Sequence, residues 1–110
     1  VLEKLKEELP GYQPPAYTGD FDPAMRSAIR STFPGTHIQG CLFHYSQCLV
    51  KKASSAEVGL HREIRRPGNI LKRFLAFTAL PLLPANDIVP VFEECAQEAL
   101  AASAQVNNFI

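Results

Sequence analysis

At 110 residues the chain can form one small domain at most, and its 46% hydrophobic and 20% charged residues exclude a disordered or fibrous protein. Lys plus Arg equals Asp plus Glu at 11 each, so no overall charge marks nucleic acid or a membrane as the partner. No apolar run reaches the roughly 18 residues of a membrane span, and the charged start VLEKLKEEL does not resemble a signal peptide.

The cysteine count and the first residue carry two further expectations. Three cysteines are an odd number without a short-range framework, which favours reduced thiols in an intracellular protein over a disulfide scaffold. The first residue is valine and not methionine. We therefore expect the chain to be a segment of a longer protein.

The first predicted element is an amphipathic helix with one buried face. Leu2, Leu5 and Leu9 recur at helical spacing among charged residues, and Pro10-Gly11 ends the helix. A short, proline-led strand follows at residues 15–19 and delivers Asp20 at its carboxyl end.

The next predicted helix begins at Asp22-Pro23, because Asp is a preferred N-cap and proline suits the first helical position. Pro34-Gly35 ends this helix, whose apolar stripe consists of Met25, Ala28, Ile29 and Phe33. Residues 37–43 are mostly apolar and too short for a helix, so they predict a buried strand. Gly40 within this strand indicates a close backbone approach.

From Tyr45 onward the pattern is helical. Residues 61–69 predict a loop or a poor helix, and residues 70–79 predict an apolar helix. Asn86 or Asp87 is the expected cap of a last helix, with Pro90 in its first turn. The element order predicts an α/β fold with two parallel strands, a right-handed crossover and flanking helices, followed by an all-helical segment.

Asp20 is the first candidate site residue. Ligands and catalytic groups gather beyond the carboxyl ends of parallel strands, and carboxylates suit magnesium. Asp20 is therefore either a metal ligand or a turn residue, whereas the cap position accounts for Asp22.

Cys41 and His44 form a Cys-x-x-His motif, and Cys48 follows one helical turn later. These three could ligate zinc with a fourth ligand from His37, His61 or Cys95. The alternative is that the thiols are buried apolar groups and that His44 is a hydrogen-bonded structural residue at the strand end. The motif alone does not decide between the two interpretations.

Basic residues gather in the middle of the neutral chain. This group could contact a phosphate backbone without reading its sequence, or it could be a solvated helix face. The group consists of Lys51, Lys52, Arg62, Arg65, Arg66, Lys72 and Arg73.

Residues 17–60 resemble the core of the Mutator-like element (MULE) transposases. In that family a strand ends in an Asp-Phe-Glu-like triplet, a helix with alanines leads to Phe-Pro, and a Cys-x-x-His motif follows the next strand, before Gln, a basic pair and Gly-Leu. The softer match beyond residue 60 is LAFTALPLLPANDIVPVFEE. The matching residues are Asp20-Phe21-Asp22, Ala24, Ala28, Phe33-Pro34, Cys41, His44, Gln47, Lys51-Lys52 and Gly59-Leu60.

The resemblance implies a partial RNase H-like core at residues 1–56 and a helical insertion segment at residues 57–110. In such DDE transposases two aspartates and a glutamate hold two magnesium ions for DNA cleavage and strand transfer. Asp20 matches the second aspartate, and Asp22 stands where the family usually has glutamate. We expect the first aspartate before Val1 and the glutamate beyond the insertion, so the segment alone should be inactive.

The resemblance also implies a nuclear protein whose partner is DNA, contacted through Lys51, Lys52, Arg65 and Arg66, and it leaves a homo-oligomer open. For Cys41 and His44 it implies site architecture without a defined catalytic role. Two alternatives remain: a domesticated, non-catalytic DNA-binding or regulatory descendant, and a small α/β interaction module with a basic helical face. Glu93, Glu94 and Glu98 are expected to face solvent on the last helix.

Overall fold

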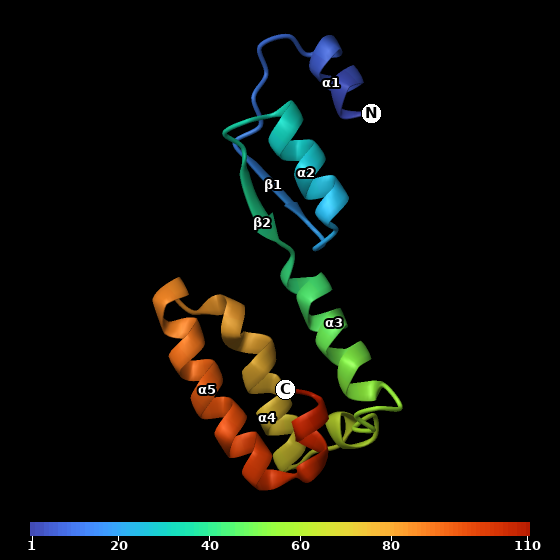
Figure 1. The fold of residues 1–110 in the computed structure, drawn as a ribbon, viewed down its shortest axis with the longest axis vertical. Helices are drawn as coiled ribbons and strands as arrows, with labels where there is room; N and C mark the ends of the chain where they lie inside the picture. Colours follow the sequence, from blue (N-terminus) through green and yellow to red (C-terminus); the bar gives the residue numbers. More distant parts are fainter. The chain divides into compact units, whose positions relative to one another are not determined.

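The computed structural model describes all 110 residues as a mixed helix and strand chain (Figure 1). Five α-helices, two β-strands and three short 3-10 helices follow one another. Their order is α1 (Leu2–Glu8), β1 (Ala16–Gly19), α2 (Pro23–Thr32), β2 (His37–Gly40), α3 (Leu42–Ser54), η1 (Glu63–Arg65), α4 (Asn69–Ala79), η2 (Leu80–Leu82), α5 (Ala85–Ala102) and η3 (Ala104–Asn108).

The chain divides into two compact units, Val1–Tyr45 and Ser46–Ile110, and not into one small domain as its length suggests. The division falls in the first half of α3. The boundary at residues 56 and 57 concerns which part resembles the RNase H-like core, and it stays a prediction.

In the first unit, β1 and β2 pair in parallel to form a two-stranded sheet, as predicted. Ala16 pairs with His37 and Gly19 pairs with Gly40. α2 joins the two strands, beginning at the Asp22 cap with Pro23 in its first turn. Figure 1 shows the helix beside the strands.

Two predictions of burial in the first unit are wrong. No residue of α1 is buried, and Leu5 and Leu9 remain 44% and 47% exposed. β2 ends at Gly40, and only Ile38 in it is partly covered. The buried apolar side chains here are Ile29 and Phe33 alone, because two four-residue strands and two short helices offer too little surface to cover one another.

α1 contacts α2 through polar groups instead. The Lys6 ammonium donates to the Thr32 carbonyl at 2.9 Å, and the Thr32 hydroxyl donates to the Glu3 carboxylate at 3.3 Å. Polar tethers of this kind contribute about 1 kcal/mol each when solvent competes for them. The attachment of α1 therefore depends on few interactions.

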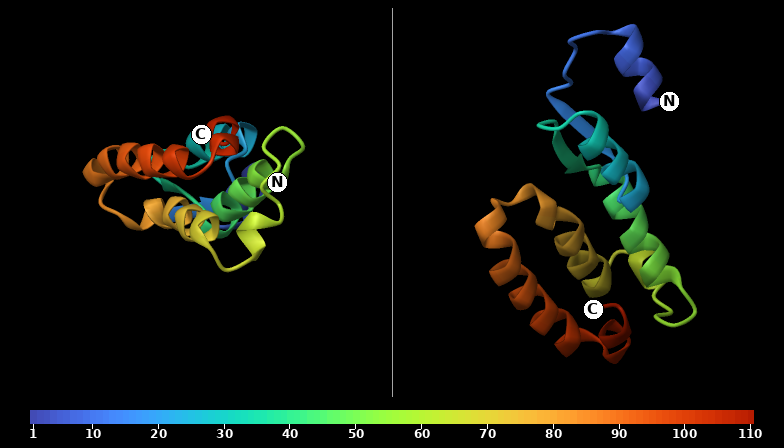
Figure 2. Two further views of the ribbon diagram at one scale, coloured as in Figure 1. Left: turned by 90° about the horizontal axis from the view of Figure 1, so that it is seen from below. Right: turned by 45° about the horizontal axis from the view of Figure 1, so that its top comes forward.

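The second unit contains the larger core, and α4 and α5 lie side by side in it, joined by η2 (Figure 2). The Phe77 ring meets the rings of Phe92 and Phe109 edge to face at 5.9 and 5.6 Å. Beside this cluster, Arg73 forms an ion pair with Glu98. The buried core consists of Ala53, Val58, Leu60, Ile64, Phe74, Phe77, Leu80, Ala96, Ala99 and Val106.

The predicted start of the last helix is also wrong. α5 begins at Ala85, after Pro84 in extended conformation, so neither Asn86 nor Asp87 caps it. Pro90 consequently lies inside the helix and not in its first turn. The expected exposure of Glu93, Glu94 and Glu98 is confirmed.

Candidate functional site

The candidate site lies where β1 and β2 end. The ladder of backbone hydrogen bonds runs from His37 N–H to the Pro15 carbonyl at 3.1 Å as far as Cys41 N–H to the Gly19 carbonyl at 2.8 Å. Because the strands are parallel and in register, their carboxyl ends share one edge of the sheet. Asp20 and Cys41 are the next residues of the two strands, so the sheet brings them to the same edge.

Asp20 is exposed at this edge and accepts one hydrogen bond, from the backbone N–H of Asp22 to its Oδ1 at 3.2 Å. No protein group donates to its second carboxylate oxygen. Asp22 differs, because its Oδ1 accepts from Ala24 N–H at 3.0 Å and caps α2 as predicted. Each carboxylate accepts one backbone N–H, so hydrogen bonding leaves one oxygen of each side chain without a donor, and the two differ in that only the Asp22 bond caps a helix.

The Cys-x-x-His motif begins at Cys41, directly before α3, and ends at His44 in the first turn of that helix, so it does not lie on a strand that continues to residue 43. The Cys41 carbonyl accepts from Tyr45 N–H at 3.0 Å, which starts the helix three residues before the predicted position. Leu42 and Phe43, which the sequence places in a buried strand, are 44% and 65% exposed. Their apolar character therefore does not predict burial here.

His44 follows on the same turn, with its ring against the edge of Phe43 at 5.8 Å between centroids. Its Nδ1 is buried and has no hydrogen-bond partner, contrary to the predicted structural hydrogen bond. The Cys41 N–H donates its hydrogen bond to the Gly19 carbonyl and not to His44.

Burial raises the pKa of the neighbouring Tyr45 above its usual value, because the phenolate would lose hydration.

Two observations test the alternative interpretations of the cysteines as zinc ligands or as buried thiols. All three cysteines are free; Cys48 is exposed, and Cys41 and Cys95 are partly covered, so the predicted burial of Cys48 on an apolar stripe is wrong. No group of three or more His, Cys, Asp or Glu side chains is placed to hold a metal ion.

The basic residues lie in the second unit. Lys52 pairs with Glu57 at 2.7 Å, and the Arg65 guanidinium lies 2.9 Å from Nε2 of His61. Lys51 and Arg66 are exposed and form no salt bridge. The same is true of Arg62 and Lys72, so charge is available on this unit for a phosphate partner.

Sequence reasoning missed the residue that touches Gly40. A Cβ built on Gly40 would lie 2.5 Å from Cε1 and 2.6 Å from Cζ of Phe21, so the Phe21 ring occupies that space. The prediction at Gly40 was a close backbone approach, and the group that lies there is a side chain, that of the aromatic residue between the two carboxylates. The contact between Phe21 and Gly40 could have been found from a simple pattern. The pattern is an aromatic residue in a strand-to-helix turn with a glycine at the end of the next strand.

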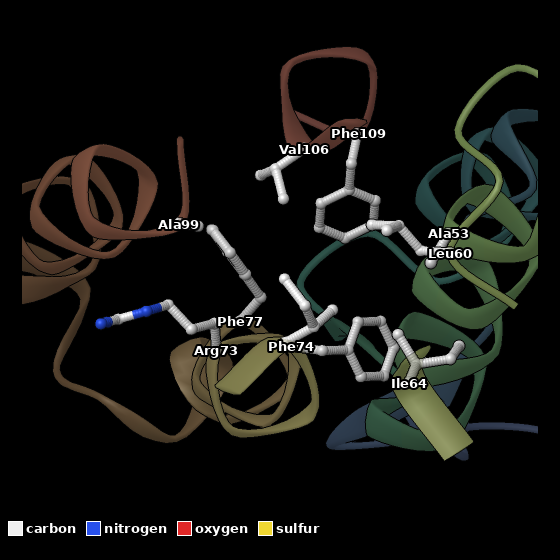
Figure 3. Close-up of a pocket in the computed structure, with 10 residues that line it drawn as sticks. Ala53, Leu60, Ile64, Arg73, Phe74, Phe77, Ala99, Val106 and Phe109 are labelled. Atoms are coloured by element: carbon white, nitrogen blue, oxygen red, sulfur yellow. The ribbon is translucent and has the colours of Figure 1, made fainter. Parts of the chain in front are cut away.

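A second, unrelated feature is a cavity in the core of the second unit (Figure 3). Its volume is about 20 Å³ and its lining includes Leu60, Ile64, Phe74, Val106 and Phe109. Small-molecule sites usually exceed about 300 Å³ and carry several polar groups. The cavity is a packing void, and the candidate site remains the sheet edge.

A hard cation is the ligand that suits the free carboxylate oxygen of Asp20.

None of the helices combines the length and apolar composition needed to cross a bilayer. Comparisons of the chain with protein-family models, with curated proteins and with solved structures gave no match.

Proposed function

We propose that this chain is part of the RNase H-like catalytic core of a MULE-type DDE transposase, with Asp20 as the second metal-binding aspartate. One observation carries the proposal: the in-register parallel strands bring Asp20 and the Cys-x-x-His motif to one edge of the sheet. The order and spacing of the motifs in residues 17–60 supply the family resemblance. In this proposal residues 57–110 belong to the helical insertion.

The residues of the edge have distinct roles in the proposed reaction. The Asp20 carboxylate would hold Mg²⁺, while the N–H of Asp22 donates to one of its oxygens. Metal ions held there would supply the Lewis-acid activation of water or a 3′ hydroxyl that attack on a phosphodiester requires. No group of three His, Cys, Asp or Glu side chains in residues 1–110 is placed to hold a metal ion, so we expect the chain alone to bind metal weakly and to cleave no DNA.

The test compares Asp20→Asn with Asp22→Asn in the full-length protein. Both substitutions remove one charge, and Asn remains a good N-cap at residue 22. We expect Asp20→Asn to reduce DNA cleavage and strand transfer about a thousandfold or more, since metal ligands have no substitute in this chemistry. Asp22→Asn should retain most activity. Equal activity of the two variants would exclude the catalytic role of Asp20.

A second candidate function is DNA binding without catalysis, as in a domesticated nuclear descendant. The exposed cations of the second unit favour it, because Lys51 and Arg66 form no salt bridge. In that case Asp20→Asn should leave the function of the full-length protein unchanged, while removal of the cations should abolish it. The same pair of measurements separates both candidates from an interaction module that binds no DNA.

A further inference from the structure

We propose that Phe21 and Gly40 form an aromatic lock that determines where the Asp20 carboxylate lies. The inference rests on the proposed function, because it assigns Phe21 and Gly40 as positioning residues for the metal ligand. Neither residue offers a side-chain group to a metal ion. Their role follows from the contact between them.

The contact joins two segments that are 19 positions apart in the sequence. Phe21 belongs to the turn between β1 and α2, and Gly40 is the last residue of β2. The Phe21 ring lies where the side chain of any other residue at position 40 would begin, with Cε1 and Cζ 2.5 and 2.6 Å from the built Cβ. Only a glycine at this strand end lets the ring rest against the backbone.

The second glycine of the edge shows why this contact is special. Gly19 pairs with Gly40 across the sheet, and the ring of Tyr17 covers it. Tyr17 and Gly19 are neighbours on one strand, so their contact joins nothing beyond β1. Phe21, in contrast, connects the turn that follows β1 to the other strand.

Asp20 lies between two anchors as a result. On its amino side, the Gly19 carbonyl accepts the last ladder bond from Cys41 N–H at 2.8 Å. On its carboxyl side, the Phe21 ring rests on Gly40. The hydrogen bond from Asp22 N–H then orients one carboxylate oxygen. Because Asp20 is exposed and the Phe21 ring connects its turn to β2, removal of the ring should loosen the turn.

The experiment measures binding of Mn²⁺, the probe, to the 110-residue chain by paramagnetic broadening of backbone amide signals near Asp20. Phe21→Ala removes the ring, and Gly40→Ala displaces it, because the clash involves the far end of a side chain and not the backbone. The variant that carries both Phe21→Ala and Gly40→Ala completes a double-mutant cycle. Tyr12→Ala removes an aromatic ring that is 53% exposed elsewhere in the first unit and serves as the matched control.

We expect each single variant to weaken Asp20-dependent Mn²⁺ binding about tenfold, as supporting residues around metal ligands commonly do. The double variant should be no weaker than the worse single variant, because both changes break the same contact. A second measurement needs no metal. In the NMR spectrum, the ring current of Phe21 should shift the Gly40 methylene signals in the wild type and not in Phe21→Ala. Slower exchange of the Asp22 amide in the wild type should disappear in both single variants.

The possible outcomes separate the lock from the proposed function. If Phe21→Ala binds Mn²⁺ like Tyr12→Ala, or if the effects of the two single substitutions add, the lock is overturned and the metal role of Asp20 stands. If Mn²⁺ broadens the same amide signals in Asp20→Asn as in the wild type, the metal role of Asp20 fails, and the positioning inference fails with it. The ring-current shift and the Asp22 exchange rate then still report whether the contact itself exists.

Discussion

Asp20 and Asp22 carry the same charge two residues apart, and their hydrogen bonds separate their roles. Asp22 accepts from the N–H of Ala24, the second residue of α2 and the first that has an N–H, which has no partner within the helix. Asp20 accepts one bond and keeps an oxygen free at the edge of the sheet. A substitution at each position should therefore affect a different property of the protein.

Asp22→Ala should lower the free energy of unfolding by about 1 kcal/mol, because the N-cap hydrogen bond is removed. Asp20→Ala should change it by no more than about 0.5 kcal/mol, since the residue is exposed and caps no helix. Urea denaturation followed by circular dichroism measures both variants. A larger destabilisation by Asp20→Ala than by Asp22→Ala would contradict this division of roles.

At the scale of the element, α5 shows tertiary packing outweighing local preference. Pro90 is the sixth residue of this 18-residue helix, and it has no N–H for the carbonyl of Asn86. The helix nevertheless begins at Ala85, because Ala96 and Ala99 are buried in the core of the second unit and Phe92 meets Phe77. The packed face more than compensates for the missing hydrogen bond.

Pro90→Ala should raise the free energy of unfolding by about 1–3 kcal/mol, because alanine restores the hydrogen bond and removes the ring from the helix interior. Pro84→Ala is the matched control, since Pro84 precedes the helix in a conformation that proline adopts readily. It should be neutral or slightly destabilising. Thermal and urea denaturation measure both. The interpretation of Pro90 fails if the two substitutions have the same effect.

For the whole molecule, the net charge is zero, but the charged residues are distributed unevenly along the sequence. Residues 51–73 contain seven Lys and Arg with two Glu, whereas residues 74–110 contain no Lys or Arg and four acidic residues. A phosphate partner would therefore bind the middle of the chain, and its affinity would depend strongly on salt.

Replacing Lys51, Lys52, Arg65 and Arg66 by Gln should weaken binding to duplex DNA and lower the slope of log affinity against log salt by about 0.9 for each phosphate that the protein no longer neutralises. The control replaces the four cations of residues 1–45, which are Lys4, Lys6, Arg26 and Arg30, and should leave the slope nearly unchanged. Fluorescence anisotropy at several salt concentrations measures both. Equal slopes for the two variants would show that net charge, and not this group, governs binding.

Local sequence determined the features that depend on neighbouring residues. Asp22-Pro23 begins α2 and Pro34-Gly35 ends it, as predicted from their capping and turn preferences. The strand at residues 16–19 and the helix at residues 69–79 also follow from short-range patterns. The parallel pairing followed from element order, and with it the meeting of Asp20 and Cys41 at one edge.

Only the tertiary structure decided which of these elements are covered and where β2 gives way to α3. The apolar residues Leu5, Leu42 and Phe43 remain exposed, because burial depends on what the rest of the chain places against a side chain. The contact between Phe21 and Gly40 likewise joins residues far apart in sequence. Sequence patterns report conformational preferences over a few residues, whereas burial and close approach are properties of the folded arrangement.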